Sequence, residues 1–166
     1  MEYVGIVSRD EKYVGVVFPQ APGCSTFGET YEEMVAMAQD ALEGWLESWL
    51  VTGDVPPEPK PVTLRKGQQS VVVRVSPRLA TAIAIRRARR AANLTQKDLA
   101  RRLKIAQSGV AKLEQRNSNP SIDTLARVFE ATGNVFDISA RKRVTSVRSQ
   151  PAAVAASRKK ASGGRR

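Results

Sequence analysis

The chain of 166 residues contains no histidine and a single cysteine. Histidine is the commonest general base and the commonest zinc ligand, so its absence excludes every Ser-His and Cys-His nucleophile pair. Cys24 has no second cysteine for an internal disulfide and no neighbours at metal-ligand spacing. We therefore expect a protein that is not an enzyme, with no catalytic residues, no metal site and no cofactor.

Long apolar runs are also missing from the sequence. No stretch approaches the roughly 18 apolar residues that a membrane-spanning helix needs. The first residues alternate like a strand and lack the charged and then apolar pattern of a signal peptide. We expect a cytoplasmic protein that makes no membrane contact.

Charge is distributed unevenly along the chain. Residues 1–60 hold 3 Lys or Arg against 11 Asp or Glu, whereas residues 61–166 hold 24 against 5. The two parts therefore carry net charges of about −8 and +19. This length fits two small domains, and a basic domain of this kind favours nucleic acid as its partner.

The first half reads as a small sheet followed by one helix. Thr30 and Glu33 have the spacing of a capping box, and apolar residues then recur at helical spacing until Gly53. Four prolines interrupt the next segment, since proline lacks the backbone donor. The expected elements are strands at 3–7, 13–18 and 25–27, a helix at 31–52, a proline-rich linker at 54–68 and a strand at 69–75.

The second half reads as a compact bundle of four short helices. Ser76-Pro77 is a cap followed by proline at the first helical position, and Thr95 with Asp98 forms another capping box. Residues 141–166 contain nine Lys or Arg and no acid, and too few apolar residues to build a core. We expect domains at 1–75 and 76–140, followed by a disordered basic tail at 141–166.

The stretch from residue 94 to residue 133 resembles the Cro and phage-repressor type of helix-turn-helix domain. The residues that carry this resemblance are Leu94 to Gln96, Leu99-Ala100, Gln107-Ser108, Val110 and Leu113-Glu114. The resemblance implies that Gln107, Ser108 and Lys112 enter the major groove and that Gln96 contacts a phosphate. A glutamine can read adenine and a lysine can donate to guanine. Arg116 completes the expected DNA-binding set.

Two positions depart from the pattern of that family. Lys104 stands at the turn where glycine is usual, and Ala106 stands where a Ser or Thr usually caps the recognition helix. The same resemblance implies a buried ion pair between Arg89 and Glu114, which we assign to structure and not to recognition. A solvated helical face with no DNA contact is the plainer alternative for the polar residues.

The segment from Val14 to Leu46 resembles the HicB antitoxins. The motifs are Phe18-Pro19, Pro22-Gly23-Cys24, Gly28-Glu29-Thr30 and Glu32-Glu33. This resemblance implies an α+β fold, in which a partial ribonuclease-H-like domain of order β-β-β-α-β precedes an all-α helix-turn-helix domain. It also implies a HicA-type, RNA-cleaving toxin as the partner.

Other functions have weaker support in the sequence. A nuclease needs carboxylates that converge on metal ions, whereas Asp10 lies in a turn and the glutamates near Thr30 are explained by capping and by the helix dipole. Trp45 and Trp49 fall on an apolar stripe, which favours a core or a partner interface. Cys24 has no base that could activate it.

We interpret the chain as an antitoxin and repressor. Its acidic domain is expected to bind and block a basic toxin, and its basic domain is expected to bind operator DNA, with a homodimer or higher homo-oligomer reading a palindrome. The alternative is a ligand-sensing repressor with no toxin partner. A metal-dependent nuclease is a third and weaker reading.

Overall fold

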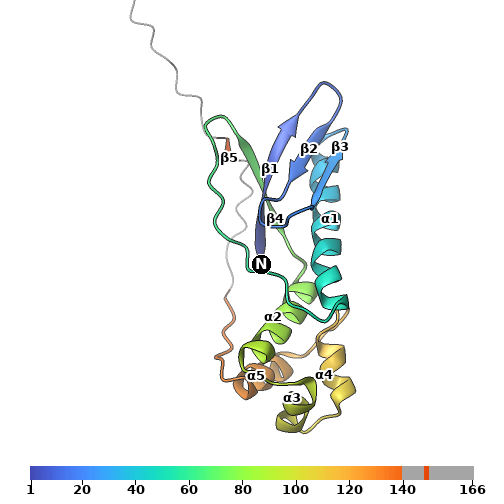
Figure 1. Cartoon of the computed structure of the whole chain (residues 1–166), viewed down its shortest axis with the longest axis vertical. Helices are drawn as coiled ribbons and strands as arrows, with labels where there is room; N and C mark the ends of the chain where they lie inside the picture. The colour runs from blue at the N-terminus through green and yellow to red at the C-terminus, as the bar shows by residue number, and fades with distance from the viewer. Residues whose placement is uncertain (140–147, 150–166) are drawn as a thin grey trace, which may run out of the picture.

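The computed structural model describes residues 1–139 and 148–149. It has the expected α+β composition, with an antiparallel sheet and one long helix at one end and a group of shorter helices at the other (Figure 1). The elements of the first part are β1 (Glu2–Arg9), β2 (Val14–Val17), β3 (Ser25–Gly28), α1 (Tyr31–Val51) and β4 (Gln69–Arg74). The expected β-β-β-α-β order is therefore present.

The sheet has the strand order β3-β2-β1-β4-β5, and every neighbouring pair is antiparallel. Alternate residues of a strand point to opposite faces, so one face of β1 and β2 is buried under α1. Tyr3, Val14 and Val16 lie on that buried face. Helix α1 covers it with residues spaced four apart, which are Met34, Ala38, Leu42, Leu46 and Leu50.

The start of α1 lies directly against the end of β3. The Thr30 hydroxyl accepts a hydrogen bond from the Glu33 backbone nitrogen at 3.1 Å, as the capping-box spacing predicts. A Cβ atom on Gly28 would lie only 2.5 Å from the Met34 backbone nitrogen. Glycine at position 28 therefore allows the helix to approach the sheet closely.

Helix α2 (Pro77–Ala91) begins at Ser76-Pro77 as predicted and contributes to both apolar cores. Leu79, Ala82 and Ile83 are fully buried in the core beneath the sheet. Ile85 instead belongs to a second core, together with Leu99, Ala100, Leu103, Val110 and Val128. The predicted domain boundary between residues 75 and 76 thus falls just before a helix that packs into both cores. The boundary itself stays a prediction.

The second part consists of α3 (Gln96–Leu103), α4 (Gln107–Leu113) and α5 (Ile122–Ala131), which pack with the C-terminal half of α2. These four helices agree with the predicted bundle. We use "sheet unit" for β1–β4 with α1, and "helical unit" for α3–α5 with the end of α2.

One short element lies within the tail that was expected to be disordered. Arg148–Ser149 form a short strand, β5, that pairs with Gln69 and Ser70 of β4. Exposed backbone at a sheet edge can take up a further strand whatever the side chains, and composition alone does not predict this. Residues 140–147 and 150–166 lie outside the described residues. Within the described part, no helix is long and apolar enough to cross a membrane.

We predict that a fragment of residues 1–91 is more stable than one of residues 1–75. The shorter fragment lacks Leu79, Ala82 and Ile83, whose contacts fill the first core. Removing a buried Leu or Ile side chain typically costs about 2 to 5 kcal/mol. Thermal unfolding followed by circular dichroism measures the difference. Equal melting temperatures for two folded fragments would show that α2 does not stabilise the sheet unit.

Candidate DNA-binding surface and the charged network beneath it

Helices α3 and α4 form the helix-turn-helix, at the end of the molecule opposite the β1–β2 hairpin (Figure 1). Thr95 caps α3, and the complete capping box with Asp98 is present. The turn after α3 places Lys104 in the left-handed conformation, with φ 56° and ψ 44°. This is the conformation for which glycine is favoured, so the lysine carries a small backbone strain of about 1 kcal/mol.

Helix α4 presents the residues that sequence analysis assigned to base reading. Gln107, Ser108 and Lys112 are exposed, whereas Val110 is fully buried against the second core. Ala106 makes no side-chain capping bond, as expected from its methyl side chain. The exposed row has the residue types and spacing to meet base edges in a major groove.

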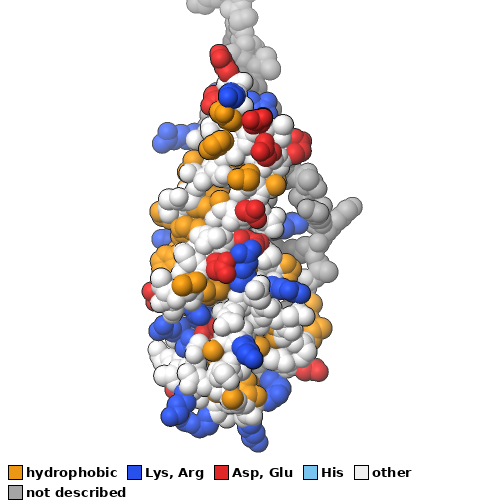
Figure 2. Space-filling view, turned by 90° about the vertical axis from the view of Figure 1, so that its right-hand side faces the viewer, with side chains coloured by type: hydrophobic (Ala, Val, Ile, Leu, Met, Phe, Trp, Pro, Cys, Tyr) orange, Lys and Arg blue, Asp and Glu red, His pale blue; other side chains and the backbone are white. Residues whose placement is uncertain are grey.

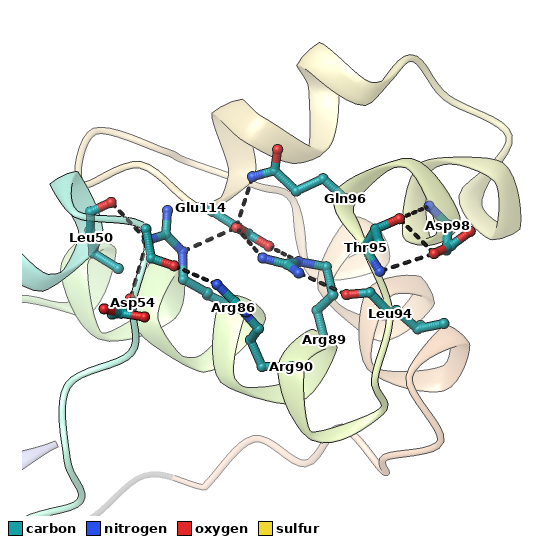
Figure 3. A network of polar contacts seen from close by, with 11 residues as sticks. Leu50, Asp54, Arg86, Arg89, Arg90, Leu94, Thr95, Gln96, Asp98 and Glu114 are labelled. Carbon is teal, nitrogen blue, oxygen red and sulfur yellow. Dashed lines mark hydrogen bonds and ion pairs between the residues drawn. The ribbon is translucent and has the colours of Figure 1, made fainter.

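A buried carboxylate lies behind this surface. Glu114, directly after α4, is completely buried and accepts hydrogen bonds from three side chains (Figure 3). Arg89 donates to both of its oxygens, at 2.5 and 3.0 Å, and Arg86 and Gln96 donate at 3.1 and 3.0 Å. The predicted Arg89–Glu114 ion pair is therefore present, and Arg86 is a partner that sequence analysis missed.

The pKa of Glu114 results from opposing effects. Burial acts to raise it, but hydrogen bonds from Arg89 and Gln96 and the charges of Arg89 and Arg86 outweigh burial, so the pKa lies below its ordinary value. The carboxylate is thus ionised at neutral pH. It links α2, α3 and the residue after α4 through charge-assisted hydrogen bonds.

Arg86 also connects the helical unit to the end of α1. Its Nη1 atom donates to the Leu50 carbonyl at 2.7 Å and to the Asp54 carbonyl at 3.2 Å (Figure 3). Arg90 donates to the Gly53 carbonyl at 2.8 Å. The last carbonyls of a helix have no partner within the helix and carry partial negative charge, so arginines there are favourable.

Two of the residues expected to contact DNA make bonds within the protein. The Gln96 amide nitrogen is bonded to Glu114, and Gln96 is half-buried. Arg116 is bonded to Glu47 at 2.7 Å and to Glu43 at 3.0 Å, both on α1. A DNA contact by Arg116 would first require breaking these two ion pairs. Gln107, Ser108 and Lys112 are exposed on α4, whereas Arg116 is bonded to α1.

The remaining candidates are accounted for by packing. The Trp45 indole donates to the Pro22 carbonyl at 3.2 Å, and its ring meets Trp49 edge to face. Cys24 is buried, and burial raises the pKa of its thiol. Among the described residues there is no group of three or more His, Cys, Asp or Glu that could hold a metal ion.

Comparison with known proteins gives matches for both parts of the chain. Residues 85–135 match a helix-turn-helix family, and residues 3–95 match the HicB-like antitoxin of bacterial toxin-antitoxin systems. Antitoxin HicB 1 of Photorhabdus laumondii subsp. laumondii is 32% identical over 124 residues, covering 75% of this chain and 76% of that protein. Antitoxin HicB 2 of the same organism is 29% identical over 140 residues, covering 84% and 96%. A solved "HicA3 and HicB3 toxin-antitoxin complex" matches at 20% identity and a TM-score of 0.37, over 46% of this chain and 100% of that one.

The fold and the exposed face of α4 define a class of protein, a regulator that joins an α+β unit to a helix-turn-helix unit that binds DNA. The chain belongs to the HicB-like antitoxin family, and it is an antitoxin with a helix-turn-helix DNA-binding domain. The sheet unit is called the antitoxin domain from here on.

We predict that Glu114→Gln lowers the free energy of unfolding at neutral pH by about 3 to 5 kcal/mol, because it leaves Arg86 and Arg89 buried beside a neutral group. The folded-state pKa of Glu114 is below the unfolded value near 4.5. The stabilisation is therefore present above that value and is lost as pH falls through the folded pKa. The gap between wild type and variant should shrink on acidification. Urea unfolding from pH 7 to pH 3 measures it.

Glu2→Gln is the matched control for this experiment. Glu2 forms an exposed ion pair with Arg74, and such pairs contribute at most about 1 kcal/mol. A Glu114→Gln variant no less stable than Glu2→Gln at pH 7 would contradict the importance assigned to the network.

Proposed function

We propose that this antitoxin neutralises a HicA-type, RNA-cleaving toxin by direct binding and represses its own operon by reading operator DNA with α4. The observation that carries the DNA-reading half is the exposed row of Gln107, Ser108 and Lys112 on a helix anchored from behind by Glu114. Because a palindromic operator has two half-sites, we propose a homodimer or higher homo-oligomer as the binding species.

Support for the toxin-binding half comes from family membership and from charge. On the face shown in Figure 2, most acidic side chains lie over the upper and middle parts of the molecule, and Lys and Arg side chains are densest at the lower, helical end. An RNA-binding toxin needs a positive surface, and an acidic domain would attract it and speed its capture. The β-β-β-α-β order supports the finer proposal of a partial ribonuclease-H-like fold for this domain.

The mode of action that we propose is binding and not catalysis, in the bacterial cytoplasm, where operator DNA lies. A ligand-sensing repressor is the rival function. The groove that a sensor could use is about 660 Å³ and lies between the sheet and the proline-rich linker. Its lining mixes prolines with the charged residues Glu58, Lys60 and Arg65. An assay of toxin binding decides between an antitoxin and a ligand-sensing repressor.

For DNA reading, Gln107→Ala and Ser108→Ala should each reduce the discrimination between operator and random DNA by about 1 to 3 kcal/mol, because each removes contacts to a base edge. Both side chains are exposed, so folding should not change. Gel-shift titrations on the two DNAs give the discrimination. Gln69→Ala and Ser25→Ala, exposed positions of the antitoxin domain, serve as controls. Unchanged operator preference in both α4 variants would remove these residues from the DNA-binding site.

For toxin neutralisation, full-length wild type and Gln107→Ala should inhibit RNA cleavage by a cognate HicA-type toxin equally well. The reason is that α4 lies at the end of the molecule remote from most of the acidic surface (Figure 2). Cleavage of a labelled RNA at increasing antitoxin concentration measures inhibition. Full cleavage in the presence of excess wild-type protein would favour the ligand-sensing repressor instead.

A further inference from the structure

We infer that Arg116 is a positioning residue for operator recognition: its ion pairs with Glu43 and Glu47 fix α4 relative to the antitoxin domain and so restrict the half-site spacing that the oligomer accepts. This inference rests on the proposed reading of paired half-sites. It differs from the role expected from sequence, in which Arg116 itself contacts DNA.

The geometry of the Arg116 contacts is that of a fork across two carboxylates. Nη1 donates to Glu47 at 2.7 Å and Nη2 donates to Glu43 at 3.0 Å. Glu43 and Glu47 are four residues apart on α1, which places them on one face of the helix. Because the guanidinium is planar and its donors diverge, such a contact fixes orientation as well as distance.

Glu43 joins three elements at this point. It is 5% exposed although it is a charged residue, so a partner for its charge is needed. One oxygen accepts from Arg116, and the other accepts from the Ser76 backbone nitrogen at 2.9 Å. Ser76 is the N-cap residue of α2. The carboxylate therefore holds α1, the start of α2 and the loop after α4 together.

A second group of contacts also joins the antitoxin domain to the helical unit. Arg86 and Arg90 donate to carbonyls at and beyond the end of α1, and Arg87 donates to the Pro56 carbonyl at 2.9 Å. Helix α2 is packed into both cores. A single shared helix can still bend or turn about its axis. The Arg116 contacts join the loop after α4 directly to α1, and they remove that freedom.

Because Arg116 follows α4 closely in the chain, its ion pairs with α1 also restrain the orientation of α4. Arg116 is three residues after the end of α4 at Leu113 and two after Glu114, which is itself anchored to Arg86 and Arg89. Arg116 is partly exposed and its partner Glu43 is buried. The best-supported use of a buried charge with a partner is to specify one arrangement, and not to add net stability. A fixed orientation of α4 matters for a protein that must place two such helices in successive major grooves.

The test uses full-length protein and palindromes taken from its own operator, with the centre lengthened or shortened by 2 base pairs. A shift of 2 base pairs turns one half-site by about 70° and moves it by about 7 Å. We expect wild-type affinity to fall at least about tenfold on shifted sites, because the two readers cannot reach both halves. The Arg116→Gln and Glu47→Gln variants should each lose less than about threefold in affinity on the same shifted sites.

Two further variants control for charge and for chain fold. Arg74→Gln removes one positive charge and an exposed ion pair inside the antitoxin domain, and it should keep the strict wild-type spacing. Arg116→Lys retains a donor for the carboxylates and should recover much of the spacing preference. Glu47 and Arg116 are both partly exposed, and the Ser76 backbone nitrogen remains as a donor to Glu43 when Arg116 is replaced, so both glutamine variants should fold.

Each outcome supports or overturns the inference. A direct phosphate contact predicts instead that Arg116→Gln weakens binding equally at all spacings and that Glu47→Gln does not. That pattern, or strict spacing retained in both variants, would overturn the inference and leave operator binding intact. Wild-type protein that binds no palindrome would overturn the proposed function itself, and this inference with it. Nitrogen-15 relaxation of the free protein gives a readout without DNA: the two parts should tumble as one body in wild type, and independent tumbling there would also overturn the inference.

Discussion

A negative charge with no access to water, that of Glu114, constrains most of the helical unit. An ionised carboxylate is stable in an apolar core only when its oxygens are surrounded by donors, and the donors here come from Arg86, Arg89 and Gln96. Two of them lie on α2 and one at the start of α3. The carboxylate therefore holds α2 and α3 in one arrangement around the end of α4. Because these bonds fix α4 from its inner side, its outer face can be polar.

The same requirement extends into the antitoxin domain through Arg86. Helix α1 has no basic residue in its last turn, so nothing within it offsets the negative end of its dipole. The arginines of α2 supply that charge, with Arg86 and Arg90 bonded to carbonyls of Leu50, Gly53 and Asp54. Arg86 thus pairs with the buried Glu114 and also donates a hydrogen bond to a carbonyl at the end of α1. The two domains are consequently coupled through backbone groups as well as through the shared helix α2.

The sequence predicted the elements well because their signals are local. Capping residues, proline positions and apolar spacing gave the four main strands, the long helix and the bundle to within a few residues. The Arg89–Glu114 pair came from the resemblance to the phage-repressor family and not from these local signals. Contacts across the domain junction had no local signal. Glu43 carries a charge beside an apolar stripe, and nothing in its neighbourhood shows that Arg116, 73 residues away, is its partner. Arg86 was likewise one of several arginines on α2, distinguished only by the three-dimensional position of Glu114.

The junction also changes what the charge of the basic half means. Residues 61–166 hold 24 Lys or Arg against 5 acids, which by itself suggests a strong and unspecific attraction to phosphate. Several of these cations are already engaged within the chain, since Arg86, Arg87, Arg89, Arg90 and Arg116 donate to carbonyls or carboxylates of the protein. Each such arginine orders the protein and contributes less to counterion release on DNA. On the proposed function, operator recognition by the helical unit then depends more on where α4 is held, and on the three side chains that it exposes, than on total charge.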